Sequence, residues 1–209
     1  MGRLLAVSDI HGYGWLLEGL LKHADYNSAK DHLYLLGDYV NKGPDSAGTL
    51  ELIRKLMDGG AVALQGNNER KWMHCIPDQS VDPAQFIPFI SILPLVSEYG
   101  PYLFVHAGLR PGVPLNAQSE KDLTEIRDEF HYAPVERGRT VVFGHTSTFR
   151  FGVSPEEIWF GDGKICIDTG AGHGHYLSLV DLTNGIQYYV SVLSPHTIRT
   201  ALLQPLHQQ

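Results

Sequence analysis

Carboxylate, amide and imidazole side chains stand beside glycine at five points of the sequence. The five motifs are Asp9-Ile10-His11-Gly12, Gly37-Asp38, Gly66-Asn67-Asn68-Glu69, His106-Ala107-Gly108 and Gly144-His145. Glycine lets the backbone turn sharply and lets a ligand approach closely. The mixture of oxygen and nitrogen donors suits manganese, iron or zinc better than calcium, which prefers oxygen alone. The motifs therefore predict a site for divalent metal ions.

The spacing of the first donors indicates how they would act. Asp9 and His11 are two residues apart, which places both on one side of an extended segment, where they can chelate one ion. Asp38 is the natural bridge, because a carboxylate can span two ions. Two ions about 3.5–4 Å apart hold and deprotonate a water, and the bridging hydroxide attacks phosphorus in line with the leaving oxygen. The predicted chemistry is phosphoester hydrolysis.

Short apolar runs precede the motifs and must position them. Strand-like runs alternate with helical spacing in the order 4–7, 15–21, 33–36, 50–57 and 61–64. This alternation predicts a βαβαβ unit with a mostly parallel sheet, whose strand ends are the usual place for ligands. Further strand-like runs lie at 102–105, 140–143, 165–167, 177–180 and 186–192, with a hairpin turn at Asn184-Gly185.

Length and composition suit one globular domain. The chain has 209 residues, of which 43% are hydrophobic and 19% charged. We expect a single domain over 1–209, with a helical insertion or cap at about 72–101, where five prolines interrupt the alternation.

Charge and cysteine content restrict partners and location. The net charge of −7 argues against a broad nucleic-acid or membrane surface, and no apolar run reaches the roughly 18 residues of a membrane helix. The N-terminal apolar run is too short for a secretory segment, and Cys75 and Cys166 are expected to be reduced thiols. We expect a cytoplasmic protein without a nucleic-acid or membrane partner. Its oligomeric state is open.

In this order the motifs resemble those of the calcineurin-like metallophosphoesterases. The likeness is strongest to the phosphoprotein-phosphatase branch, with its lambda-phage-type and bacterial serine/threonine protein phosphatases. It covers about residues 3–192 and includes the segments 122–127 and 167–171. The resemblance implies an α/β fold, a four-layer α-β-β-α sandwich with a dinuclear metal site at the strand ends.

The resemblance also implies residue roles. It assigns one ion to Asp9, His11 and Asp38, and a second to Asp38, Asn67, His106 and His145. It implies two divalent ions, for which we favour Mn²⁺, with Fe or Zn as alternatives. Arg127 matches the phosphate-binding arginine, which clamps phosphoryl oxygens. The other candidate substrate contacts are Lys42, Asn67 and Arg110, and Arg110 is explained equally well as a surface arginine.

Three residues depart from the family pattern. Asn41-Lys42 replaces an Asp-Arg pair, and Asn68 replaces the histidine credited with protonating the leaving oxygen. Lys42 keeps the charge but loses the planar fork of arginine. Loss of a general acid, which contributes about 10²–10⁴-fold, predicts a preference for aryl phosphates, phosphotyrosine and phosphoanhydrides over phosphoserine. The catalytic candidates are Asp38, Asn41, Lys42, Asn68 and Arg127. Whether Asn68 is natural or an engineered replacement is open.

Three functions follow from these features. The leading expectation is a metal-dependent phosphomonoester hydrolase like the serine/threonine protein phosphatases, acting on a phosphorylated protein or a small phosphoester. The alternative is a dinucleoside polyphosphate hydrolase of the diadenosine tetraphosphate type, which needs room and basic groups for a second nucleotide. A third possibility, of another class, is a catalytically impaired, metal-bound binding protein.

Overall fold

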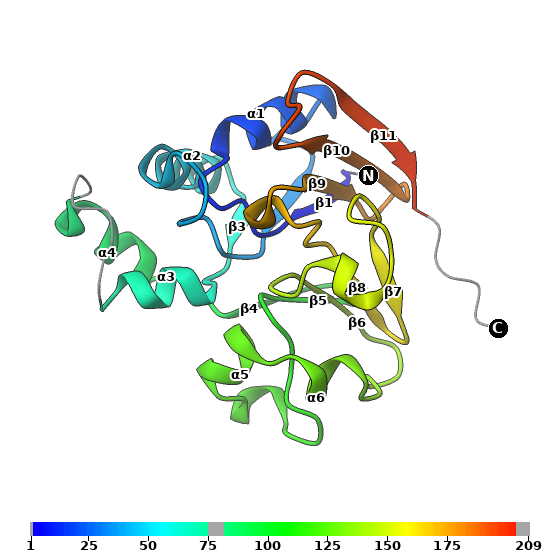
Figure 1. Ribbon diagram of the computed structural model, residues 1–209. Coiled ribbons are helices and arrows are strands. Elements are labelled where there is room, and N and C mark those ends of the chain that lie inside the picture. Colours follow the sequence, from blue (N-terminus) through cyan, green and yellow to red (C-terminus); the bar gives the residue numbers. More distant parts are fainter. Residues whose placement is uncertain (1, 75–81, 204–209) are drawn as a thin grey trace.

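Two stacked β-sheets form the centre of the molecule (Figure 1). The computed structural model describes residues 2–74 and 82–203. The first sheet has the order β11-β10-β9-β1-β2-β3, and the second has the order β4-β5-β6-β8-β7. The strands of the first are β1 Leu4–Val7, β2 His32–Leu35, β3 Val62–Ala63, β9 Tyr176–Asp181, β10 Ile186–Ser191 and β11 Ile198–Leu202. Those of the second are β4 Val96–Tyr99, β5 Tyr102–Val105, β6 Thr140–Phe143, β7 Trp159–Gly161 and β8 Lys164–Cys166.

Each sheet has a parallel part flanked by antiparallel strands. In the first sheet β1, β2 and β3 are parallel, whereas β9, β10 and β11 are antiparallel additions. In the second sheet β5, β6 and β8 are parallel, with β4 and β7 antiparallel at the edges. The turn between β9 and β10 contains Gly185 at φ 66°, which confirms the predicted hairpin. Because parallel strands end at the same edge, each sheet delivers three strand ends to one place.

Helices cover the outer face of each sheet. The α-helices are α1 Gly14–His23, α2 Ser46–Asp58, α3 Asn67–Trp72, α4 Pro83–Ser91, α5 Glu120–Glu125 and α6 Asp128–His131, and short 3₁₀ turns lie at Leu115–Ala117, Thr148–Phe151 and Ala171–His173. The first long helices begin close behind the strand ends. At the start of α2 the Asp45 carboxylate accepts a hydrogen bond from the Gly48 N–H at 2.8 Å, a typical N-cap.

Three apolar cores separate four layers. Alternate residues of β1 face different cores: Leu5 and Val7 pack against α1 and α2, whereas Leu4 and Ala6 pack between the sheets with Phe104. The third core lies between the second sheet and helices α5 and α6. Strands buried on both faces explain why these runs are continuously apolar. The arrangement confirms the expected α-β-β-α sandwich (Figure 1).

The proline-rich segment 72–101 is not helical throughout. Within its described part, α4 packs Phe86 and Ile90 into the first core. The chain then forms β4, which pairs with β5 across the turn at Gly100-Pro101. The expected helical structure therefore does not extend to Val96 and beyond, because backbone pairing with β5 incorporates these residues into the second sheet. A capping role for this segment stays a prediction.

Two further expectations concern membranes and thiols. Within residues 2–74 and 82–203, no helix is long and apolar enough to cross a bilayer. Cys166 is a buried free thiol, and burial raises its pKa. Cys75 lies outside the described residues.

A charged cluster ties the N-terminal strand to the loop before β2. The Asp31 carboxylate accepts hydrogen bonds from Arg3 Nη2 at 2.6 Å and from the Asn27 N–H at 3.0 Å. The Arg3 hydrogen bond, aided by the Asn27 N–H, lowers the pKa of Asp31 to about 2. The carboxylate is therefore charged and paired over most of the accessible pH range.

We predict that Asp31→Asn lowers the free energy of unfolding by about 1–2 kcal/mol at pH 7, because charge-assisted bonds to a partly exposed arginine are lost. Since the folded pKa lies below the unfolded value, this contribution is complete above about pH 5 and falls to about half near pH 3. Urea denaturation at both pH values measures it. Glu18→Gln, at an exposed carboxylate, is the control. If the loss of unfolding free energy in Asp31→Asn is the same at both pH values, the stabilising role of the Asp31 charge is contradicted.

Candidate metal centre

The strand ends of both sheets bring the predicted donors together. Asp9 and Asp38 follow β1 and β2, and His106 and His145 follow β5 and β6. Their ligand atoms form two groups, each within 4.8 Å: Asp9, His11 and Asp38 in one, and Asp38, His106 and His145 in the other. Asn67 joins the second group, because its Oδ1 lies 3.1 Å from His106 Nε2. Asp38 belongs to both groups, as a bridging carboxylate must.

The donors are presented by turns and not by extended chain. Asp9, His11, Asp38 and His145 have φ values of 53°, 48°, 56° and 63°, in the left-handed region. The expectation that Asp9 and His11 share one side of an extended segment is therefore wrong. Backbone hydrogen bonds to the neighbouring loop impose the turn, among them His11 N–H to Asp38 O at 2.9 Å. Left-handed backbone at non-glycine residues costs about 1–3 kcal/mol each and gathers at functional sites.

Glu69 holds two of these loops together. Its buried carboxylate accepts hydrogen bonds from the backbone N–H groups of Asp38, Tyr39 and Gly66 at 2.7, 2.8 and 2.9 Å. Burial, together with the charge of Asp38, raises the pKa of Glu69 to about 8. The sequence places Glu69 only near the site, within the third motif. The sequence does not show its structural role, because that role consists of hydrogen bonds to the loop after β2.

The imidazoles of His11 and His106 turn Nε2 toward the centre, and Lys42 Nζ lies 3.1 Å from His11 Nε2. His11 Nδ1 lies 3.0 Å from Val40 O, and His106 Nδ1 lies 2.8 Å from Leu36 O. A carbonyl oxygen only accepts, so each Nδ1 carries the hydrogen and each Nε2 keeps its lone pair. Burial lowers the pKa of His11, and burial is also the largest cause that lowers the pKa of His145 to about 2. Both rings are neutral near pH 7, the form that binds metals.

Two observations show that a divalent cation fits these residues. His145 Nε2 is buried and has no hydrogen-bond partner among the described residues. Burial and the like charges of Asp168 and Asp38 raise the pKa of Asp9 well above its usual range. A cation between these groups would bind the orphaned nitrogen and relieve the carboxylate repulsion. The donor set therefore fits a cluster of divalent metal ions.

Motif glycines let the two sheets approach at the centre. A Cβ at Gly144 would overlap Ser8 Oγ and the Asp9 carboxylate, and a Cβ at Gly66 would overlap the Asp38 N–H. No side chain can therefore stand at these two positions without displacing a donor.

Asp168 lies at the site, although the sequence motifs do not single it out. It follows β8, is buried, and accepts hydrogen bonds from Ser147 Oγ at 2.9 Å and the Gly170 N–H at 2.8 Å. Its position at a strand end, like that of Asp9, is the signal that could have identified it.

A positively charged pocket of about 200 Å³ opens above the centre. It is lined by Asp38, Asn67, Asn68, His145, Lys42, Lys71, Arg127, Arg150 and His173. The donors at its floor are largely buried, whereas all the cationic side chains are exposed. Of the cationic side chains, Lys42 and Arg127 are predicted contacts, whereas Lys71 and Arg150 have no sequence signal. His173, whose pKa burial lowers, has none either. Arg127 Nη1 donates to Thr146 Oγ1 at 3.0 Å, which orients its guanidinium.

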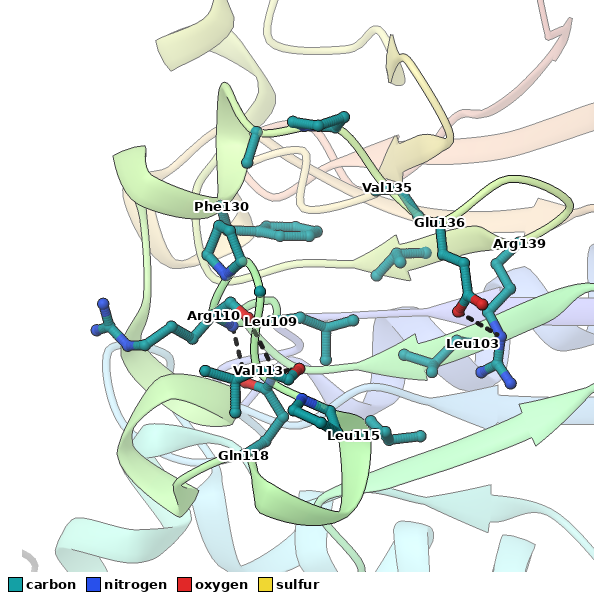
Figure 2. Close-up of a pocket in the computed structure, with 16 residues that line it drawn as sticks. Leu103, Leu109, Arg110, Val113, Leu115, Gln118, Phe130, Val135, Glu136 and Arg139 are labelled. Carbon is teal, nitrogen blue, oxygen red and sulfur yellow. Dashed lines mark hydrogen bonds and ion pairs between the residues drawn. The ribbon is translucent and has the colours of Figure 1, made fainter.

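Arg110 lies elsewhere. It lines a separate cavity of about 490 Å³ beside β5 and α6, among side chains such as Leu109 and Phe130 (Figure 2). Its guanidinium pairs with Asp122 at 2.6 Å. The structure therefore does not bring Arg110 to the pocket above the metal centre, in contrast to the sequence-based expectation.

Comparison with known proteins identifies the family. The family model for calcineurin-like phosphoesterases matches residues 2–190. A symmetrical bis(5'-nucleosyl)-tetraphosphatase of Aromatoleum aromaticum is 32% identical over 124 residues, which cover 52% of this chain and 45% of the relative. The chain spans about half the length of the curated relatives it matches.

Two solved structures are similar over most of the chain. A candidate diadenosine tetraphosphatase has a TM-score of 0.71 at 27% identity, covering 97% of this chain and 94% of that chain. A cold-active protein-tyrosine phosphatase of a psychrophilic Shewanella species has a TM-score of 0.63 at 16% identity, covering 98% of this chain and 81% of that chain. The second likeness concerns the fold alone.

These relatives correct the leading functional expectation. The curated relatives are named as tetraphosphatases, whereas the solved protein phosphatases share the fold at 15–18% identity. The expectations of a serine/threonine protein phosphatase and of a phosphorylated protein partner are therefore wrong. The physical reason is that metal-ligand motifs specify phosphoryl chemistry, and the pocket around them selects the substrate. By its fold, its donors and the match over residues 2–190, the chain belongs to the calcineurin-like phosphoesterase family and is a metal-dependent phosphoric ester hydrolase.

Proposed function

We propose that this chain hydrolyses a phosphoanhydride bond of dinucleoside polyphosphates. The observation that carries the proposal is the charge of the pocket. Four of the sixteen Lys and Arg residues, in a chain of net charge −7, line this one pocket: Lys42, Lys71, Arg127 and Arg150. Among the described residues that line it, Asp38, a predicted metal ligand, is the single carboxylate. The similarity to a candidate diadenosine tetraphosphatase over nearly the full length of both chains supports the same substrate class.

The number of cations argues for more than one phosphoryl group. A phosphomonoester presents a single dianion, which the metal centre and Arg127 would neutralise. A polyphosphate carries further negative charge on either side of the bond to be cleaved. Lys71 and Arg150 belong to different elements, α3 and the 3₁₀ turn after β6, and their exposed side chains both line this pocket. They are suited to the flanking phosphoryl groups.

The reaction assigns a task to each set of residues. Asp9, His11, Asp38, Asn67, His106 and His145 would hold the metal ions, which supply Lewis acidity and an activated water when bound. We favour manganese, because the donors mix oxygen and nitrogen, with iron and zinc as alternatives. Arg127 and Lys42 orient the phosphoryl group under attack. The water oxygen bonds to phosphorus, the bridging P–O bond breaks with its electron pair on the leaving phosphate, and a proton passes to solvent. Symmetrical cleavage of a tetraphosphate yields two nucleoside diphosphates. A cytoplasmic location stays a prediction.

We predict that chelation by EDTA abolishes hydrolysis of diadenosine tetraphosphate and that added Mn²⁺ restores it. Asp38→Asn should lower kcat by about 10³-fold or more, because a ligand shared by both metal groups loses its charge. Chromatography of the nucleotide products measures both effects. Asp25→Asn is the matched control, since Asp25 is exposed and has a similar left-handed backbone at φ 51°. Turnover that persists without metal contradicts the proposal, and absence of any turnover with metal favours a binding protein.

We predict that Lys71→Ala and Arg150→Ala each lower kcat/KM for diadenosine tetraphosphate by about 10-fold, the loss of one charge-assisted phosphate contact. Hydrolysis of p-nitrophenyl phosphate, which has a single phosphoryl group, should change much less. Lys55→Ala is the control, because Lys55 is exposed on α2 and does not line the pocket. Equal losses on both substrates would show that these cations act on the attacked phosphoryl group and would contradict their assignment to flanking groups.

A further inference from the structure

Four side chains form a line of hydrogen bonds beside the metal centre. Trp72 Nε1 donates to Asn41 Oδ1 at 2.7 Å. Asn41 Nδ2 donates to Asn68 Oδ1 at 2.8 Å, and Asn68 Nδ2 donates to Asp38 Oδ2 at 2.5 Å. Trp72, Asn68 and Asp38 are buried, so little water competes for these bonds. The line runs from the end of α3 to a carboxylate shared by both donor groups.

The two ends of the line determine its direction. An indole N–H only donates, and a carboxylate only accepts. Asn41 must therefore turn its oxygen to Trp72 and its amide nitrogen to Asn68, and Asn68 must turn its amide nitrogen to Asp38. Reversing either amide would bring two donors or two acceptors face to face, at a cost of about 1–3 kcal/mol for each unpaired buried group. Asp38 requires this orientation of Asn68 directly, and Trp72 reinforces it through Asn41, which holds Asn68 Oδ1.

Asn41 is suited to this position by its backbone as well. Its φ of 66° lies in the left-handed region, which asparagine and aspartate tolerate better than most residues. Its N–H donates to Ser46 Oγ at 2.9 Å, which fixes the loop. An aspartate has the same shape but no hydrogen to donate, so it would repel Asn68 Oδ1. The two asparagines at 41 and 68 therefore depend on each other.

Asn68 also faces the substrate pocket. It is among the residues lining that pocket, and its Nδ2 has no second acceptor among the described residues. One amide hydrogen is therefore available to an oxygen of a bound substrate. An amide N–H stabilises a developing oxyanion by a hydrogen bond, but it does not release its proton near neutral pH.

We propose that Trp72 and Asn41 position Asn68 as a fixed hydrogen-bond donor to the leaving oxygen. Because this donor is neutral, it restricts the site to leaving groups that depart as stable anions. When the bridging P–O bond breaks, its electron pair stays on the leaving oxygen. A phosphate or aryl oxide departs as the anion, whereas an alkoxide is a strong base and needs a proton that Asn68 does not supply. The inference rests on the proposed function, because a phosphoanhydride is the substrate that needs no acid.

Side-chain amide NMR of the metal-free protein tests the positioning directly. The Asn41 and Asn68 amide signals, identified by their loss in Asn41→Asp and Asn68→Ser, should exchange slowly with solvent. Trp72→Phe should shift both signals and speed their exchange by about 10-fold or more. Asn184 is the internal reference, because its Nδ2 donates to Asp181 Oδ2 at 2.8 Å without a link to Trp72. Trp159→Phe is the matched control for loss of a tryptophan. Unmoved Asn68 signals in both Trp72→Phe and Asn41→Asp would overturn the proposal.

The dependence of rate on the leaving group tests the restriction. The protein should hydrolyse aryl phosphates at least 10²-fold faster than phosphoserine, in line with the usual contribution of an acid. The double variant Asn41→Asp/Asn68→His introduces a proton donor at position 68 and a carboxylate partner at position 41. It should lower the ratio of the aryl phosphate rate to the phosphoserine rate by about 10-fold or more. Equal rates on phosphoserine and aryl phosphates in the unmodified protein would overturn the restriction. Failure to hydrolyse diadenosine tetraphosphate, with the aryl preference and the NMR shifts intact, would overturn the proposed function alone.

Discussion

The carboxylate of Asp38 is the point on which both sheets converge. Its Oδ2 lies 3.6 Å from His11 Nε2 on the side of the first sheet, and its Oδ1 lies 3.4 Å from His106 Nε2 on the side of the second. Burial alone would raise the pKa of Asp38, but its polar surroundings, among them His106, His11 and the Asn68 N–H, lower it, so the group stays charged. A buried charge is tolerated only where it is paired. The surrounding loops are built to meet that requirement, with Asn68 binding both carboxylate oxygens.

The need to pair the buried charge of Asp38 explains where non-glycine residues adopt strained backbone conformations. Of the seven non-glycine residues with positive φ in the described chain, six belong to the metal-site loops, and Asp25 is the exception. Strained turns persist only where neighbouring structure holds them. Here the restraint comes from the carboxylate of Glu69, which accepts four backbone hydrogen bonds from two loops, and from the close approach at Gly66 and Gly144. These restraints hold the donor loops in their strained conformations.

The charged side chains around Asp38 form two layers, one buried and one exposed. Acids and neutral imidazoles form the buried floor, and lysine and arginine side chains form the exposed rim. The floor suits cations and the rim suits polyanions, so the two layers together match a metal-bound phosphate chain. Asn68 lies between the layers, and the line of hydrogen bonds from Trp72 holds it in the orientation that Asp38 requires.

The sequence by itself singled out the six candidate donors that the structure brings together, and several strands, among them β1, β5 and β6 with the bounds that the apolar runs predict. These features are local, because a strand and the turn behind it are encoded by adjacent residues. Only the tertiary structure decided that Lys71 and Arg150 share one pocket, that Asp168 approaches Asp9, and that Arg110 lies elsewhere. Edge strands such as β11 were not predicted either, because they are short or weakly apolar. Such outcomes depend on contacts between segments far apart in the chain, about which adjacent residues carry no information.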